Sequence, residues 1–188
     1  MTMSASQTVG PFFVIGLEHL YRADLTGAEV FGKAITVSGR VLDGDGKPVP
    51  DAVLEFWQAD AEGNFGDGKI EAVGHGAATG FSGFARIPTD ESGKFKLRTI
   101  LPGGVAAGDG VEAQAPHLGV FIFMRGLLKP LYTRVYFAGG PGNETDPVLG
   151  LVPAERRGTL IARKGAARET FEWNVLLQGP KETVFFAW

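Results

Sequence analysis

The sequence predicts an all-β domain, a sandwich or barrel of short strands with long loops and little helix. Three observations lead to this fold class. Apolar and polar residues alternate over several short segments, as they do on strands with one buried face. Glycine and proline contribute 28 and 11 of the 188 residues and are spread along the chain, which is typical of frequent turns. Helical periodicity is scarce, so a set of evenly spaced strands joined by turns fits best.

The alternation is clearest at residues 35–42, which we predict to form the first strand. Asp-Gly pairs in the next segment, residues 43–48, favour the tight turn that reverses the chain. Residues 90–93 predict a second such turn, and one short helix rich in Glu and Arg is expected at residues 154–161. The further strands are expected at residues 53–59, 83–87, 94–99, 119–124, 132–137 and 170–177.

Two glycine-rich segments, residues 63–80 and 102–116, predict long loops. Loops on a β scaffold often carry function, although flexible surface is the simpler interpretation. Both ends of the chain are apolar, at residues 11–17 and 183–188. Such ends must be tied into a core or a partner, so an edge strand and a subunit interface are equally suitable interpretations.

Length and composition narrow the class of protein. The 188 residues suit a single domain spanning residues 1–188, and the net charge of −3 gives no basic footprint for nucleic acid. The absence of cysteine excludes disulfides, thiolate catalysis and Cys-type zinc sites. Neither a targeting segment nor a run of about 20 apolar residues is visible. These observations lead us to expect a cytoplasmic protein.

Taken alone, the residues show no self-contained catalytic set. The three histidines, His19, His75 and His117, are isolated from one another, and an isolated histidine is more often structural than metal-binding. The Gly-Asp-Gly-Lys string at residues 66–69 lacks the frame of a phosphate-binding loop. A Gly-x-Ser-x-Gly nucleophile elbow is also missing from the sequence.

Longer motifs point to a family. Residues 6–13 (SQTVGPFF), 38–43 (SGRVLD) and 54–60 (LEFWQAD) are distinctive. With the segments 46–52, 115–118, 134–137 and 182–186, they make the chain resemble the intradiol ring-cleavage dioxygenases over essentially its whole length. The resemblance implies a β-sandwich, in agreement with the predicted strands. It also implies that an aromatic ring is cleaved between two hydroxyl-bearing carbons, with incorporation of both atoms of O₂.

The resemblance implies that this chain lacks the family's metal ligands. Family members hold Fe(III) with two tyrosines and two histidines. The matching positions here are Phe65, Val105, Leu118 and Val120, and none of these side chains carries a donor atom. We therefore expect four degenerate ligand positions, packed as apolar core, and no metal bound by this chain. An arginine that family members carry nearby is replaced by Ala115.

The resemblance further implies an obligate partner. It likens the chain to the iron-free α subunit of a two-subunit family member, whose β subunit holds Fe(III) near the shared interface. We expect the N-terminal segment, residues 1–30, to pack on that subunit and to lend Thr8, Gly10 and Pro11 to the wall of its site. Arg125 is expected to face the carboxylate of the substrate, and a solvated charge at a strand end is the alternative for this residue.

Two other functions stay open at this point. An iron-free chain of this family could act without a catalytic partner, as a binding or scaffold protein. A self-sufficient dioxygenase would need unusual ligands, for which His75, His117 and Tyr132 are available. Tyr132 and Tyr136 fall on the same face of their predicted strand, but without paired histidines they are better explained as packing residues.

Overall fold

Nine strands form one continuous, curled sheet in the part of the chain that the structure describes. The structure is a computed structural model that describes residues 6–10, 12–27, 30–65, 81–106 and 112–187. The strand order is β3-β2-β5-β6-β7-β8-β1-β4, and β9 pairs with β1. The strands are β1 (Ala34–Leu42), β2 (Val53–Trp57), β3 (Phe84–Pro88), β4 (Lys94–Ile100), β5 (His117–Phe123), β6 (Leu131–Phe137), β7 (Ile161–Lys164), β8 (Thr170–Glu172) and β9 (Val175–Leu176).

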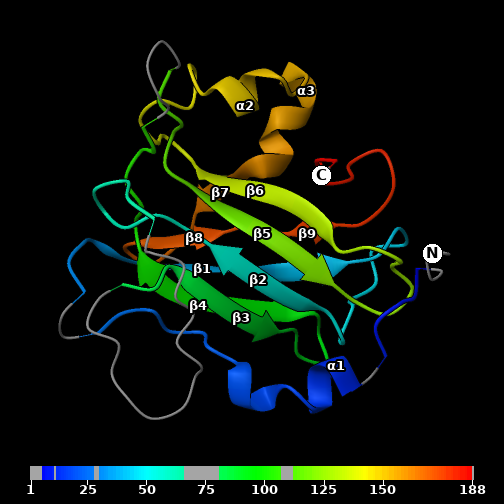
Figure 1. Cartoon of the computed structure of the whole chain (residues 1–188). Coiled ribbons are helices and arrows are strands. Elements are labelled where there is room, and N and C mark those ends of the chain that lie inside the picture. Colours follow the sequence, from blue (N-terminus) through cyan, green and yellow to red (C-terminus); the bar gives the residue numbers. More distant parts are fainter. Residues whose placement is uncertain (1–5, 11, 28–29, 66–80, 107–111, 188) are drawn as a thin grey trace, which may run out of the picture.

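Among the described residues, helix occurs in short segments at the two ends of the sheet (Figure 1). The α-helices are α1 (Phe12–Ile15), α2 (Pro147–Gly150) and α3 (Ala154–Arg157), and the 3-10 helices are η1 (Glu18–Leu20) and η2 (Gly158–Leu160). Figure 1 shows α2 and α3 at one end of the molecule and α1 at the opposite end. The predicted all-β class with little helix is therefore confirmed.

The core lies between the two layers that the curled sheet makes. Leu54 and Phe56 of β2 and Leu118 of β5 are fully buried there, together with Val37 of β1 and Leu97 of β4. These residues are alternate positions of their strands, so the pattern in the sequence places one face of each strand in the core. Burying this face supplies the main driving force for closing the sheet on itself.

The predicted strands are found with small shifts, and two differences have clear causes. The predicted strand 170–177 is two strands, because Trp173 donates its backbone N–H to Ser38 O and Asn174 accepts from Arg40 N through its side chain. Strand β7 is not among the predicted strands. The helix expected at residues 154–161 is present as α3 and η2 and ends at residue 160, directly before β7 begins. Ile161 pairs in parallel with Tyr136, a long-range contact that no local pattern indicates.

A strap formed by residues 22–25 connects the two free edges of the sheet. Arg22 pairs with Arg86 at the β3 edge, and Asp24 pairs with Arg98 at the β4 edge. Leu25, which follows, is 1% exposed and belongs to the core. Part of the N-terminal segment that was expected to pack on a partner thus packs on the chain's own sheet.

The apolar chain ends do not form edge strands in the described residues. Residues 12–15 form helix α1, and near the C-terminus Phe186 makes a single antiparallel bridge to Tyr132. None of the helices formed by the described residues is both long enough and apolar enough to cross a membrane.

Candidate functional site

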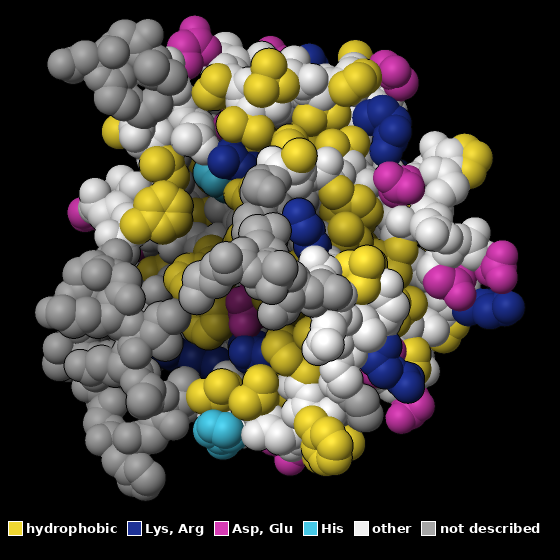
Figure 2. Space-filling model, turned by 45° about the vertical axis from the view of Figure 1, so that its right-hand side comes forward, with side chains coloured by type: hydrophobic (Ala, Val, Ile, Leu, Met, Phe, Trp, Pro, Cys, Tyr) yellow, Lys and Arg dark blue, Asp and Glu magenta, His cyan; other side chains and the backbone are white. Residues whose placement is uncertain are grey.

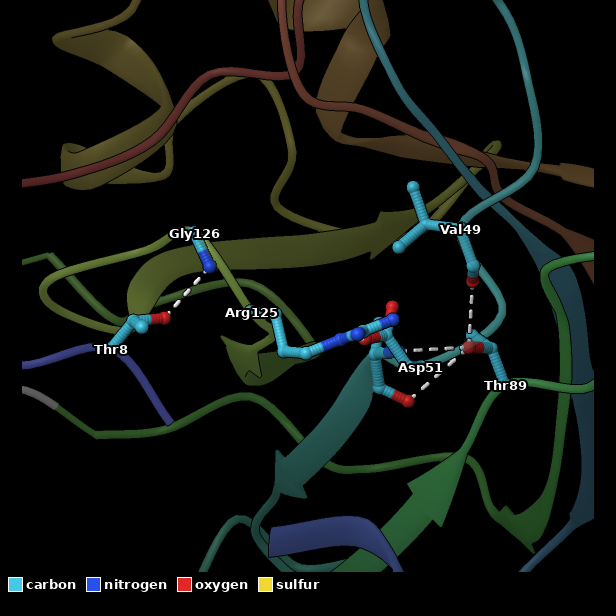
Figure 3. A network of polar contacts seen from close by, with 7 residues as sticks. Thr8, Val49, Asp51, Thr89, Arg125 and Gly126 are labelled. Carbon is cyan, nitrogen blue, oxygen red and sulfur yellow. Dashed lines mark hydrogen bonds and ion pairs between the residues drawn. The ribbon is translucent and has the colours of Figure 1, made fainter. Parts of the chain in front are cut away.

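The turn after β5 brings together two residues that the sequence singled out. Gly126 lies in this turn with a φ of +92°, a conformation that favours glycine. Its backbone N–H donates to the hydroxyl oxygen of Thr8 at 2.7 Å (Figure 3). The neighbouring residue in the turn is Arg125. The fold therefore places Thr8, near the start of the chain, beside Arg125, which is 117 residues away in the sequence.

Arg125 is held by Asp51, which lies in the motif segment 46–52 but for which the sequence predicted no role at a site. Its Nε forms an ion pair with Asp51 Oδ2, and Figure 3 shows the guanidinium extended toward this carboxylate. The side chain of Arg125 is 61% exposed and that of Asp51 is 25% exposed. Because Asp51 engages Nε, the two terminal nitrogens of the guanidinium remain the natural donors for a ligand.

Hydrogen bonds of the side chain of Thr89 fix the turn that carries Asp51. This buried hydroxyl donates to Val49 O at 2.7 Å and accepts from Ala52 N at 3.1 Å (Figure 3). Residues on both sides of Asp51 are thus tied to the end of β3. The sequence offers no signal for this arrangement, since Thr89 reaches Val49 and Ala52, on either side of Asp51, only through the pairing of β2 with β3.

Of the two other N-terminal residues expected at the site, Gly10 and Pro11, the structure describes Gly10. Gly10 is exposed, and a Cβ atom at this position would meet no other atom within 4 Å. Its carbonyl accepts from Phe13 N at 3.0 Å, which joins it to helix α1. Pro11 lies outside the described residues.

The four degenerate ligand positions do not come together in the fold. Leu118 and Val120 are fully buried and point into the core between the layers. Phe65, in contrast, is 57% exposed. Val105 is half-buried and exchanges two backbone hydrogen bonds with Gln114, each of 2.9 Å. The apolar packing expected for this set is thus present at Leu118 and Val120 only.

The loops that carry Phe65 and Val105 meet on the other face of β5. Gly63 packs so closely against Gly104 that a Cβ atom on Gly63 would lie 2.0 Å from Gly104 O. Gln114, the partner of Val105, accepts from Arg134 Nη1 at 2.6 Å. Arg134 pairs with Gly119, so its side chain is on the face opposite to Leu118. The β5 residues on the side of these loops are therefore His117 and Gly119.

This opposite face carries a network of neutral and charged polar groups. Arg134 Nε donates to Tyr132 Oη at 3.3 Å, and Tyr136 Oη donates to the buried Asp146 at 3.0 Å. His117, paired with Tyr136, donates from Nδ1 to Ala115 O at 2.8 Å. Burial lowers the pKa of His117, so the imidazole stays neutral near pH 7. As expected, Tyr132 and Tyr136 share one face of β6.

These residues do not fit a ferric ion. Burial raises the pKa of Tyr136, which opposes formation of the tyrosinate that Fe(III) requires. Nδ1 of His117 is already bonded to Ala115 O, and Tyr132 Oη accepts from Arg134, so neither group is arranged as a metal ligand; His75 lies outside the described residues. Within the described part of the chain, no group of three or more His, Asp or Glu side chains is arranged to hold a metal ion.

Exposed apolar side chains flank the Thr8–Arg125 region. Phe12 and Ile15 of α1 are 79% and 62% exposed, and Leu128, in the loop after Arg125, is 64% exposed. Figure 2 shows the side of the molecule on which Figure 1 marks both chain ends, with hydrophobic side chains at the surface among charged ones. Exposed apolar groups of this size are typical of surfaces that contact another protein.

Comparisons with known proteins relate the chain to dioxygenases. The family model described as Dioxygenase matches residues 10–179. The protocatechuate 3,4-dioxygenase alpha chain of Burkholderia cepacia is 40% identical, covering 99% of this chain and 98% of its own. The alpha chain from Pseudomonas putida is 34% identical, with coverage of 96% and 94%. The beta chain from Burkholderia cepacia is 32% identical, with coverage of 89% and 74%.

Solved structures show the same fold. The dioxygenase domain of a carbohydrate-binding fusion protein from Streptomyces sp. SirexAA-E aligns with a TM-score of 0.63 at 28% identity, over 87% of this chain and 89% of its own. The 3-chlorocatechol 1,2-dioxygenase of Rhodococcus opacus 1CP aligns with a TM-score of 0.64 at 22% identity, over 94% and 68%. With the match of the family model over most of its length, this chain belongs to the intradiol dioxygenase family.

Proposed function

We propose that this chain is the iron-free α subunit of a protocatechuate 3,4-dioxygenase. The observation that carries the proposal is the alpha chain of Burkholderia cepacia, which is 40% identical and matches over 98% of its own length. The beta chain of the same organism is matched at 32% identity over only 74% of its length. The non-ligating side chains at Phe65, Val105, Leu118 and Val120 support an iron-free role.

In this proposal a β subunit is the obligate partner and binds Fe(III). The complex cleaves protocatechuate between its two hydroxyl-bearing carbons and incorporates both atoms of O₂, which gives 3-carboxy-cis,cis-muconate. The described residues of this chain do not fit the metal, and the contribution proposed for the chain is to bind and orient the substrate at the shared interface. The cytoplasmic location expected from the sequence belongs to the same proposal.

Arg125 is the residue we assign to the substrate carboxylate. Its side chain is 61% exposed and is oriented by Asp51 through Nε. Two terminal N–H donors of a guanidinium match the two oxygens of a carboxylate, which gives both attraction and a fixed orientation. Thr8, Gly10 and Pro11 form the neighbouring wall of the partner's site in this proposal, and the hydrogen bond from Gly126 to Thr8 keeps that wall beside Arg125.

The test is to purify the chain alone and then together with a β subunit that carries the tyrosine and histidine ligands. Iron content, visible absorption and ring cleavage of protocatechuate are measured in both preparations. We expect a colourless, inactive chain alone, and a coloured, active, stoichiometric complex, because tyrosinate–Fe(III) absorbs visible light. Iron and turnover in the isolated chain would show a self-sufficient enzyme. A chain that forms no complex with the β subunit would point to an independent binding or scaffold protein.

A further inference from the structure

Helix α1 is fastened to the sheet by the ring of Phe13. This ring lies 5.1 Å from the ring of Phe123, centroid to centroid, and 4.6 Å from the guanidinium carbon of Arg86. Phe12, its neighbour, is 79% exposed. The short helix therefore directs one ring to the sheet and the next to solvent, so Phe13 is the side chain that attaches it.

The guanidinium of Arg86, which packs against the ring of Phe13, has few other partners among the described residues. Arg86 is 8% exposed and forms an ion pair of 3.0 Å with Glu55 on the neighbouring strand β2. Its Nε and Nη2 have no hydrogen-bond acceptor among the described residues. A buried guanidinium gains more from an aromatic face than an exposed one, because water does not compete for the charge. Arg86 and Phe13 thus form a strong, oriented contact.

The contacts of Phe13 extend to both elements of the proposed substrate wall. Its backbone N–H donates to Gly10 O at 3.0 Å, which fixes the segment that carries Thr8. On the other side, Phe123 ends β5 two residues before Arg125. Tyr21 adds a second fastening, because its hydroxyl donates to Val14 O at 2.5 Å. The ring of Phe13 therefore helps to fix the position of the N-terminal segment relative to the turn that carries Arg125.

We propose that Phe13, clamped between Arg86 and Phe123, is a positioning residue that sets the geometry of the substrate wall formed by Thr8, Gly10 and Arg125. This inference rests on the proposed function of those residues. Phe13 and Arg86 make no contact with substrate in this arrangement, and they act by holding the N-terminal segment in place. Loss of the clamp therefore weakens substrate binding more than it slows turnover.

The experiment is steady-state kinetics of protocatechuate cleavage by the complex of this chain with its β subunit. Phe13→Leu keeps an apolar side chain but removes the aromatic face, and we expect KM to rise about three- to tenfold with kcat changed less than about twofold. Phe13→Tyr keeps the ring and should retain the KM of the native complex. Phe31→Leu is the matched control, because Phe31 is 87% exposed and outside the clamp; it should leave both constants unchanged.

A second variant addresses the same contact from the other side. Arg86→Lys keeps the positive charge for Glu55 but loses the planar group that covers the ring, so the same rise in KM is expected. If Phe13→Leu fails to assemble with the β subunit, Arg86→Lys decides the question. Hydrogen exchange of the complex should show faster exchange of the amides of Phe13 and Gly16 in either variant, since these amides bond within the clamped segment.

A double-mutant cycle separates this inference from the proposed function. Thr8→Val removes the acceptor of the Gly126 N–H, and if Phe13 acts through this segment, the effects of Phe13→Leu and Thr8→Val on KM should be less than additive. An unchanged KM in Phe13→Leu and Arg86→Lys, with a raised KM in Thr8→Val, overturns the clamp alone. An unchanged KM in Thr8→Val and Arg125→Gln as well overturns the assignment of these residues to substrate binding, and the clamp with it, whereas a native complex that does not cleave protocatechuate overturns the proposed function itself.

Discussion

Arg125 illustrates how a single side chain is made ready for a ligand by residues distant in the sequence. The carboxylate of Asp51 pairs with Nε of Arg125, and Thr89 fixes the turn on which Asp51 lies. An exposed ion pair of this kind adds little stability, since solvent screens it and ordering two side chains has an entropic cost. Its value lies in orientation: the outer edge of the guanidinium faces away from Asp51 and remains free to bind an anion.

Replacement of Arg125 should therefore affect substrate binding rather than folding. We expect Arg125→Gln to raise KM by about ten- to hundredfold, which corresponds to a charge-assisted hydrogen-bonded pair of about 1.5–3 kcal/mol. Asp51→Asn should give a smaller rise, because the charge remains but its orientation is lost. Kinetics of the complex test this, with Arg168→Gln as control, since that side chain is 92% exposed and remote in the sequence. Equal effects of Arg125→Gln and Arg168→Gln would contradict the assignment.

His117 should make the stability of the fold depend on pH. Burial lowers its pKa from 6.5, so the unfolded chain gains a proton near that pH and the folded chain only at lower pH. Between these two values the unfolded state binds more protons, so the free energy of unfolding falls as the pH falls below 6.5.

The variant His117→Asn keeps a donor for Ala115 O and removes the titration. Urea unfolding of the purified chain at several pH values from about 7.5 down to 5.5 measures the effect. The native chain should lose stability relative to His117→Asn over this range. Parallel pH profiles of the two chains would show that His117 does not titrate as its burial implies.

At the scale of elements, Asp146 connects three parts of the fold. Its side chain accepts from Val148 N at 2.9 Å and Leu149 N at 2.7 Å, and thereby caps helix α2. It also accepts from Tyr136 Oη on β6 and from Ala115 N before β5. With an exposure of 1%, this carboxylate is a buried charge satisfied entirely by hydrogen bonds.

Removing this carboxylate should be strongly destabilising. We expect Asp146→Ala to cost about 3 kcal/mol, because it removes a helix cap and leaves buried donors without an acceptor. Asp146→Asn keeps one oxygen and should cost less. Denaturant unfolding of the two variants gives the comparison, and a loss below about 1 kcal/mol in the alanine variant would contradict this role.

At the scale of the whole molecule, the strap of residues 22–25 determines how the curled sheet is closed. It pairs with β3 at Arg86 and with β4 at Arg98. Exposed strand edges are templates for pairing with other chains, so a bridge at each edge leaves less edge backbone available for such pairing. Leu25 ends the strap in the core, at 1% exposure.

Truncating this anchor should therefore weaken the whole domain. We expect Leu25→Ala to lower the free energy of unfolding by about 2–5 kcal/mol, through lost burial and the cavity that remains. Leu151→Ala is the matched control, because Leu151 is 83% exposed, and its cost should stay within about 0.5 kcal/mol. Urea unfolding of both variants tests the difference. Similar unfolding curves for the two would mean that the strap does not contribute to global stability.

The fold class, most strands and the family could all be predicted from the sequence. Alternation of apolar and polar residues assigned the two faces of strands such as β1, and the Asp-Gly turns placed the reversals between them. Through the resemblance the sequence also predicted Thr8 and Arg125 as site residues, which the proposed kinetics test. Strand β7 could not be predicted in this way, because its pairing with Tyr136 and Phe137 is a long-range contact with no local pattern.

Which residues contact one another depends on the three-dimensional path of the chain. The alternation of side chains along a strand predicts that Leu118 and Val120 share one face of β5. It does not indicate whether that face packs in the core or against the loops that carry Phe65 and Val105. The closure of the sheet buries it in the core. Likewise Asp51 and Arg125, or Phe13 and Arg86, are brought together only by strand pairing and by the path of the N-terminal segment. Side-chain contacts across a sheet depend on topology, which local periodicity does not contain.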